Sequence, residues 1–160
     1  MSINIAIIHQ DKKLTTQFLE KLEEMISSIL EERELQKGEL GLIFADDLHL
    51  EQLNEKYRGK SGPTDVLSFN YLEPNEKEDY LADADNDEFA FGDIYISLDR
   101  AAEQAIDMKH SLESEIARLS VHGLLHLLGF EHENDQDAAL MEQHEIDLLH
   151  RFYPETPEVS

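Results

Sequence analysis

The stretch that decides the fold runs from Leu112 to His132 and reads LESEIARLSVHGLLHLLGFEH. Its leucine-rich part, up to Leu128, predicts a helix that packs against other elements instead of lying in solvent. Gly129 follows directly, and glycine readily adopts the left-handed backbone conformation that ends a helix. We therefore expect a central helix over Leu112–Leu128 and a turn immediately after it.

Strands are expected mostly before this helix, and further helices on both sides of it. Apolar patterns and flanking turn residues predict strands at residues 2–9, 39–45, 64–70 and 89–98. Asp11 and Asp46 are suitable N-caps for two helices, and the remaining helices are expected at 99–108 and 135–152. The first of these helices should run to about Arg33. This order predicts an α+β fold, with a small mixed four-stranded sheet packed by about five helices.

No internal repeat or linker divides the chain, so we expect one domain over residues 1–153. The acid-rich segment Glu73–Glu88 cannot form a core and is predicted to be a solvated loop inside that domain. Residues 154–160, with Pro154 and Pro157, should form a disordered tail.

Composition excludes several classes of protein. The chain has no cysteine, so disulfides, thiolate metal sites and a cysteine nucleophile are excluded, and a metal must be bound by histidine and carboxylate. No apolar run is long enough to span a membrane, and no export signal precedes the first strand, which predicts a cytoplasmic protein with no membrane partner. Thirty-six acidic and thirteen basic side chains give a net charge of −23, which repels nucleic acid at long range.

Three of the eight histidines fall between His122 and His132. His122 and His126 are four residues apart, so on a helix both imidazoles lie on one face and can bind one ion. A turn at Gly129 lets His132 return as a third ligand. Three neutral imidazoles leave one position of a tetrahedral zinc ion open, which is typical of a hydrolytic site and not of a structural one. We expect one catalytic Zn²⁺ at the C-terminal end of the central helix.

The spacing of these histidines also resembles that of the metzincin proteases. In those enzymes a glutamate general base follows the first histidine, whereas this chain has Gly123. The difference disfavours peptide hydrolysis by that mechanism.

With Gly123 in place, the histidine segment resembles the signature of the YbeY family of rRNA-maturation endoribonucleases. Residues 57–60 leading into 63–69 (YRGK and PTDVLSF) and residues 92–97 (GDIYIS) are similar to two further family motifs. The three motifs occur in family order. This chain has Glu131 and Ser61 where the family commonly has aspartate. The resemblance implies a single α+β domain, zinc on His122, His126 and His132, and a functional arginine at Arg58.

It also implies single-strand-specific cleavage in ribosomal RNA processing, at the 3′ end of 16S rRNA, and a part in ribosome quality control. The partners implied are single-stranded rRNA, the ribosome or its 30S subunit, and assembly proteins. Two alternatives remain open. One is a zinc-dependent hydrolase of peptides or small molecules, and the other is a non-catalytic, zinc-stabilised module for ribosome assembly.

Basic residues are concentrated at Lys56, Arg58 and Lys60. Arg58 can donate two hydrogen bonds to a phosphate and stabilise transition-state charge, and Lys60 is a further candidate for substrate binding. Glu131 is a candidate catalytic acid beside the third histidine. Asp65 and Asp93 are alternatives, so the general base stays unassigned, and the RNA can instead contribute its own 2′-hydroxyl as the nucleophile.

A buried carboxylate is expected at Glu145, which falls among apolar residues of the last helix. Such a group needs a partner. It can accept the second ring N–H of a zinc-binding histidine, as commonly occurs around zinc, or serve in a cap or an ion pair.

Overall fold

The computed structural model describes residues 2–7, 14–33, 35, 38–59, 62, 64–70, 90–129 and 134–154. Four strands form one sheet in the order β1-β2-β4-β3: β1 (Ser2–Ile7), β2 (Glu39–Ala45), β3 (Val66–Asn70) and β4 (Ala90–Ser97). The β1/β2 and β2/β4 pairs are parallel, whereas β3 pairs antiparallel with β4. The predicted four-stranded mixed sheet is confirmed, and β3 forms one of its edges.

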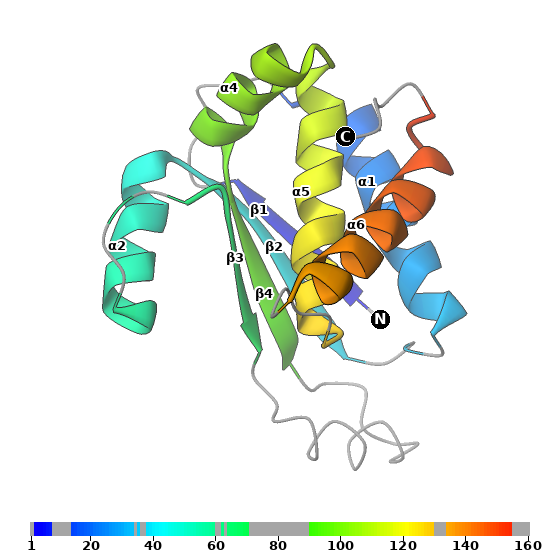
Figure 1. Cartoon of the computed structure of the whole chain (residues 1–160), viewed down its shortest axis with the longest axis horizontal. Coiled ribbons are helices and arrows are strands. Elements are labelled where there is room, and N and C mark those ends of the chain that lie inside the picture. The colour runs from blue at the N-terminus through cyan, green and yellow to red at the C-terminus, as the bar shows by residue number, and fades with distance from the viewer. Residues whose placement is uncertain are drawn as a thin grey trace.

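Five helices surround the sheet in the described part of the chain. They are α1 (Thr16–Glu32), α2 (Asp47–Arg58), α4 (Leu98–Met108), α5 (Leu112–Leu127) and α6 (Asp135–His150). Figure 1 shows α2 on one face of the sheet and α5, α1 and α6 on the other. Helix α5 packs against β3, β4, α1, α4 and α6. The prediction of a single α+β domain with a central helix is confirmed.

The apolar residues form a core on each face of the sheet. The larger core fills the space between the sheet and helices α1, α5 and α6, and includes Phe44, Ile94 and Leu124. A smaller cluster lies under α2, around Leu50 and Leu67. Full burial of one such leucine or phenylalanine contributes about 1.5–3 kcal/mol, so the two faces together fix α5 and α2 against the sheet.

Two of the predicted helix boundaries differ from the structure by more than one residue. Helix α1 begins after Thr15, whose hydroxyl accepts a hydrogen bond from Phe18 N at 3.1 Å, so the expectation of Asp11 as its N-cap is wrong. Both residue types cap helices, and the apolar stripe alone does not select between them. At the other end of the chain, α6 stops at His150, before the predicted Phe152. Asp46 does cap α2, by accepting from His49 N at 2.8 Å.

Several predictions concern residues outside the described ranges. The acidic segment 73–88 falls there, as do residues 155–160 of the predicted tail. Within the described ranges, none of the helices has the length and apolar character needed to cross a membrane.

Candidate metal and phosphate site

Helix α5 places two imidazoles side by side in its last turns. His122 Nε2 and His126 Nε2 lie 3.1 Å apart, and the ring centroids are separated by 4.7 Å. This is the arrangement expected from a spacing of four residues on a helix. Both nitrogens therefore point toward one location, as predicted.

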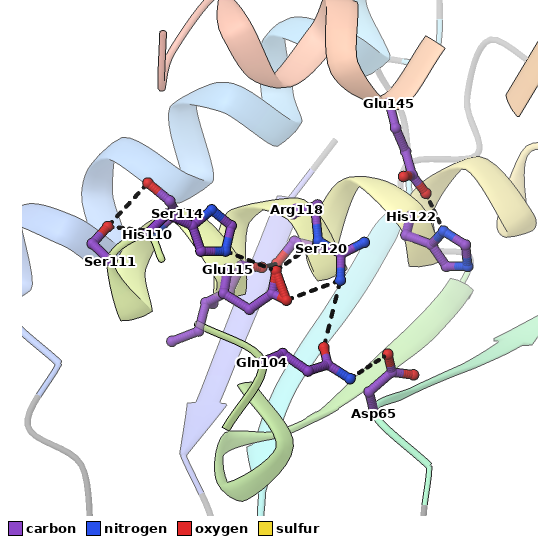
Figure 2. Close-up of polar contacts among 11 residues, drawn as sticks. Asp65, Gln104, His110, Ser111, Ser114, Glu115, Arg118, Ser120, His122 and Glu145 are labelled. Carbon is purple, nitrogen blue, oxygen red and sulfur yellow. Dashed lines mark hydrogen bonds and ion pairs between the residues drawn. The ribbon is translucent and has the colours of Figure 1, made fainter. Parts of the chain in front are cut away.

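The second ring nitrogen of His122 contacts a carboxylate from another helix. Glu145 of α6 projects toward α5, and its Oε1 is hydrogen-bonded to His122 Nδ1 (Figure 2). Glu145 is only 6% exposed. Because a carboxylate only accepts, Nδ1 carries the hydrogen and the lone pair of His122 is left on Nε2. Of the roles considered for Glu145, the contact with a histidine ring is the one found.

The geometry of the pair fits a zinc ion. Two imidazole nitrogens bound to one zinc at about 2.0–2.1 Å and tetrahedral angles lie about 3.3 Å apart. The observed separation of 3.1 Å is close to that value. No group of three metal-binding side chains occurs within the described residues. The predicted third ligand, His132, lies outside them, as do Glu131 and Lys60.

Gly123 is required by packing. A Cβ at this position would lie 2.7 Å from Ile94 Cγ2, 3.1 Å from Ser68 Oγ and 3.2 Å from Val66 Cγ2. The Ser68 hydroxyl also donates a hydrogen bond to the Gly123 carbonyl oxygen at 2.9 Å. Residue 123 thus faces the sheet at close range, and the side chain of a glutamate there would clash with β3 and β4. This explains in physical terms why the residue after the first histidine is not the protease general base.

The helix ends as the sequence predicts. Leu128 is the C-cap of α5, and Gly129 has a φ of 100°, a conformation that side chains with a Cβ rarely adopt. The chain therefore turns sharply just after the histidine pair.

A pocket of about 570 Å³ opens beside the two histidines at the β3 edge. Side chains from both faces of the sheet reach it: Ser68 contacts α5, whereas Phe69 belongs to the cluster under α2. Arg58, the last residue of α2, lines the same pocket, so the structure brings it together with the imidazoles. The complete lining comprises Tyr57, Arg58, Thr64, Asp65, Val66, Ser68, Phe69, Asn70, His122, His126 and Leu127.

Asp65 of this pocket is the first member of a chain of polar contacts (Figure 2). Gln104 Nε2 donates to Asp65 Oδ2 at 3.1 Å, and Arg118 Nη2 donates to Gln104 Oε1 at 3.5 Å. Arg118 donates to both oxygens of the fully buried Glu115, at 2.6 and 2.9 Å. His110 Nε2 lies 3.2 Å from Glu115 Oε1. The network fixes the orientation of Asp65 from the interior.

Arg118 stays a cation at the centre of this network. Burial alone lowers the pKa of Arg118, but the hydrogen bond and charge of Glu115 and the charges of Glu145 and Asp65 raise that pKa above its ordinary value. A permanent positive charge therefore lies near both Asp65 in the pocket and Glu145 behind His122.

Of the carboxylates considered from sequence, Asp65 lines the pocket and Asp93 is not among its described lining. Asp93 Oδ1 lies against Gly41, only 2.1 Å from where a Cβ on that glycine would be. Its neighbour Ile94 instead faces α5. Asp93 is thus a packing partner of strand β2.

Sequence reasoning missed several residues that shape the site. Asn54 is buried and its Nδ2 donates to the Gly62 carbonyl oxygen at 3.2 Å, which ties the segment after Arg58 back to α2. Asn70 Nδ2 donates to Leu127 O at 3.4 Å, which ties the end of β3 to the end of α5. For Asn54 the sequence does contain a signal, because a polar residue on an apolar face of a helix indicates a buried side chain that needs a hydrogen-bond partner. The partners of Asn70 and Arg118 depend on tertiary structure alone.

Known proteins are similar to this chain over most of its length. A family model described as Endoribonuclease YbeY matches residues 4–153. Endoribonuclease YbeY of Clostridium beijerinckii is 39% identical over 145 residues, covering 84% of this chain and 87% of that protein. The protein of the same name from Geobacillus sp. (strain WCH70) is 36% identical over 153 residues, covering 95% and 97%.

A solved structure is similar over nearly the same length. The solution structure of TM1509 from Thermotoga maritima matches with a TM-score of 0.64 and 25% sequence identity, covering 96% of this chain and 90% of that one. The family model and the curated relatives span almost the whole chain. The chain therefore belongs to the endoribonuclease YbeY family, a family of RNA-cleaving hydrolases.

Proposed function

We propose that this protein is a single-strand-specific, zinc-dependent endoribonuclease that acts in ribosomal RNA processing, at the 3′ end of 16S rRNA, and in ribosome quality control. The observation that carries the proposal is the pocket shared by Arg58, His122 and His126. A phosphate-binding group and a pair of metal-binding groups facing one hollow are what hydrolysis of a phosphodiester requires. The names of the relatives supply the substrate class, RNA.

The metal ligands proposed are His122, His126 and His132, with one Zn²⁺. Glu145 holds His122 in the tautomer whose lone pair is on Nε2, the nitrogen that lies beside His126 Nε2, which supports the assignment. The turn at Gly129 provides the change of direction that His132 needs. A zinc ion in such a site supplies Lewis acidity and makes water nucleophilic near neutral pH.

Arg58 is proposed to bind the scissile phosphate. It is exposed at the end of α2, and no ion pair joins it to a carboxylate among the described residues. Its guanidinium can therefore donate paired hydrogen bonds to two phosphate oxygens and stabilise the charge that develops on them. Lys60, two residues later in the chain, is proposed as a second, weaker contact to the RNA backbone.

Asp65 and Glu131 are the candidates for moving a proton. Asp65 lines the pocket, and its Oδ2 accepts a hydrogen bond from Gln104. This leaves Oδ1 as the oxygen to receive a proton from water or a 2′-hydroxyl. Glu131 is proposed because it directly precedes His132, the proposed third ligand, in the sequence.

The cellular setting is proposed to be the cytoplasm, with the 30S subunit or ribosome and assembly proteins as partners. A chain with a net charge of −23 gains little from general attraction to RNA. Binding to a ribosomal particle raises the local concentration of the RNA, which offsets this weakness.

The test compares wild type with Arg58→Ala and His126→Ala on single-stranded and duplex RNA of the same sequence. Wild type should cleave only the single strand. Arg58→Ala should lower kcat about 10²–10³-fold, as loss of one transition-state donor does, and His126→Ala should abolish cleavage. Arg151→Ala, which removes an exposed arginine of the segment after α6, is the matched control and should cleave normally.

Three outcomes contradict the proposal. Binding of RNA by wild type without cleavage indicates the assembly module. Turnover of peptides by wild type and not by His126→Ala indicates the alternative hydrolase. Equal cleavage by wild type and His126→Ala assigns the activity to a contaminating ribonuclease.

A further inference from the structure

One exposed aromatic ring on the rim of the pocket has no role in the proposed chemistry. Tyr57 is 59% exposed and lies in the last turn of α2, next to Arg58. Four large apolar side chains are exposed within the described residues: Leu48, Tyr57, Ile106 and Leu140. Of these, Tyr57 alone lines the pocket that contains the histidines.

The ring of Tyr57 is supported by a row of aromatic side chains. Its edge-to-face contact with Phe69 has a centroid distance of 5.5 Å, and Phe69 makes the same type of contact with Tyr95 at 5.7 Å. Lys56 Nζ lies 5.1 Å from the Tyr57 centroid. Because Phe69 and Tyr95 belong to strands β3 and β4, the ring is fixed relative to the sheet. A ring already held in place loses little conformational entropy when a ligand covers it.

A flat, exposed ring beside an arginine matches the repeating chemistry of a nucleic acid strand. Aromatic side chains stack unpaired bases, and arginine binds the neighbouring phosphate. Stacking displaces no counterions, so it adds affinity even where the protein is as acidic as this one. A base within a duplex is already stacked and paired and is unavailable to such a ring.

We propose that Tyr57 stacks an unpaired base of the RNA whose adjacent phosphate is bound by Arg58, and that this contact selects single strands. The inference rests on the proposed function, since it takes RNA as the ligand of the pocket. It adds a base-binding subsite to the phosphate and metal sites.

The experiment measures binding of the full chain, loaded with zinc, to a short single-stranded 2′-O-methyl oligoribonucleotide by fluorescence anisotropy. A second oligonucleotide has the same backbone with abasic positions, and a gel checks that neither is cleaved. The variants are Tyr57→Ala, Tyr57→Phe and Leu48→Ala. Leu48 is as exposed as Tyr57 and belongs to the same helix, but it lies outside the described lining of the pocket.

Tyr57→Ala should weaken binding of the normal oligonucleotide about 5- to 150-fold, the range found for loss of one stacked base. Tyr57→Phe should remain close to wild type because it keeps the aromatic face, and Leu48→Ala should be unchanged. On the abasic oligonucleotide, wild type and Tyr57→Ala should bind equally weakly. The salt dependence should be the same in wild type and Tyr57→Ala, whereas Arg58→Ala should reduce its slope by about one unit.

The proposal is overturned if Tyr57→Ala binds the normal oligonucleotide as wild type does, if it weakens both oligonucleotides equally, or if wild type binds neither. A different result would show that the proposed function fails while the stacking proposal holds. Binding would then depend on Tyr57 and on the bases, but unmodified single-stranded RNA would not be cleaved.

Discussion

Replacing Glu145 with glutamine tests whether α6 holds the histidine pair ready for a metal. The contact of Glu145 with His122 Nδ1 joins two helices and is almost excluded from water. Glutamine keeps the size and shape of the side chain but removes the charge that favours Nδ1–H. Loss of such an outer partner of a zinc ligand typically costs 10- to 100-fold in metal affinity, which is about 1.4–2.7 kcal/mol.

The assay is a competition titration of zinc between the protein and a coloured chelator. Glu142→Gln is the matched control, because Glu142 is an exposed glutamate one helical turn before Glu145. We expect the zinc Kd to rise 10- to 100-fold in Glu145→Gln and to stay unchanged in Glu142→Gln. Cleavage of RNA by Glu145→Gln should recover at saturating zinc. Equal zinc affinity in wild type and Glu145→Gln, or equal weakening in both variants, would refute the reasoning.

Three further changes have defined outcomes. Gly123→Ala should lower the free energy of unfolding by about 1 kcal/mol in a urea titration. Overpacking against Ile94 costs about 1–3 kcal/mol, and the higher helix propensity of alanine offsets about 1 kcal/mol of this cost. A variant more stable than wild type would contradict the close approach of residue 123 to the sheet. Arg118→Met should lower the free energy of unfolding by about 3–5 kcal/mol, because it leaves the buried Glu115 without its main partner, and adding Glu115→Gln should restore part of this loss. If the effects of the two substitutions simply add in the double variant, the two residues do not stabilise the fold as a pair. Arg58→Lys should cleave single-stranded RNA about 10-fold or more slower than wild type because lysine cannot donate the paired hydrogen bonds, and a rate equal to wild type would exclude bidentate binding.

The central helix and its end could be predicted because they depend on local sequence. A leucine-rich segment followed by Gly129 specifies a buried helix and its stop, and the structure has both. The capping role of Asp46 is local in the same way. The start of α1 was predicted wrongly because Asp11 and Thr15 are both good caps, and the choice depends on where Phe18 meets the core.

The order of the strands could not be predicted from the sequence. Strand β4 lies between β2 and β3, so that β3 forms an edge although it precedes β4 in the chain. In this order β3 packs against α5, and the contact includes the hydrogen bond from Ser68 to Gly123. The pocket exists because of this order, since an edge strand allows Arg58 from one face to approach His122 from the other.

For the site, the sequence identifies groups whose spacing carries the chemistry. The separation of His122 and His126 by one helical turn was sufficient to predict that their nitrogens converge. The sequence predicts a buried carboxylate at Glu145 but does not identify its partner, because His122 lies on a different helix. Tyr57 belongs to the family-like motif at residues 57–60, but the sequence does not indicate a stacking role for it, because an exposed tyrosine at the end of a helix is common and its role depends on the pocket beside it.

The most direct test of the central claim follows RNA cleavage while zinc is returned to metal-depleted full-length protein. We predict that the depleted protein is inactive on single-stranded RNA, that cleavage rises with added zinc and levels off at one ion per chain, and that His126→Ala stays inactive throughout. Cleavage at the full rate by the depleted protein, or by His126→Ala, would contradict the account.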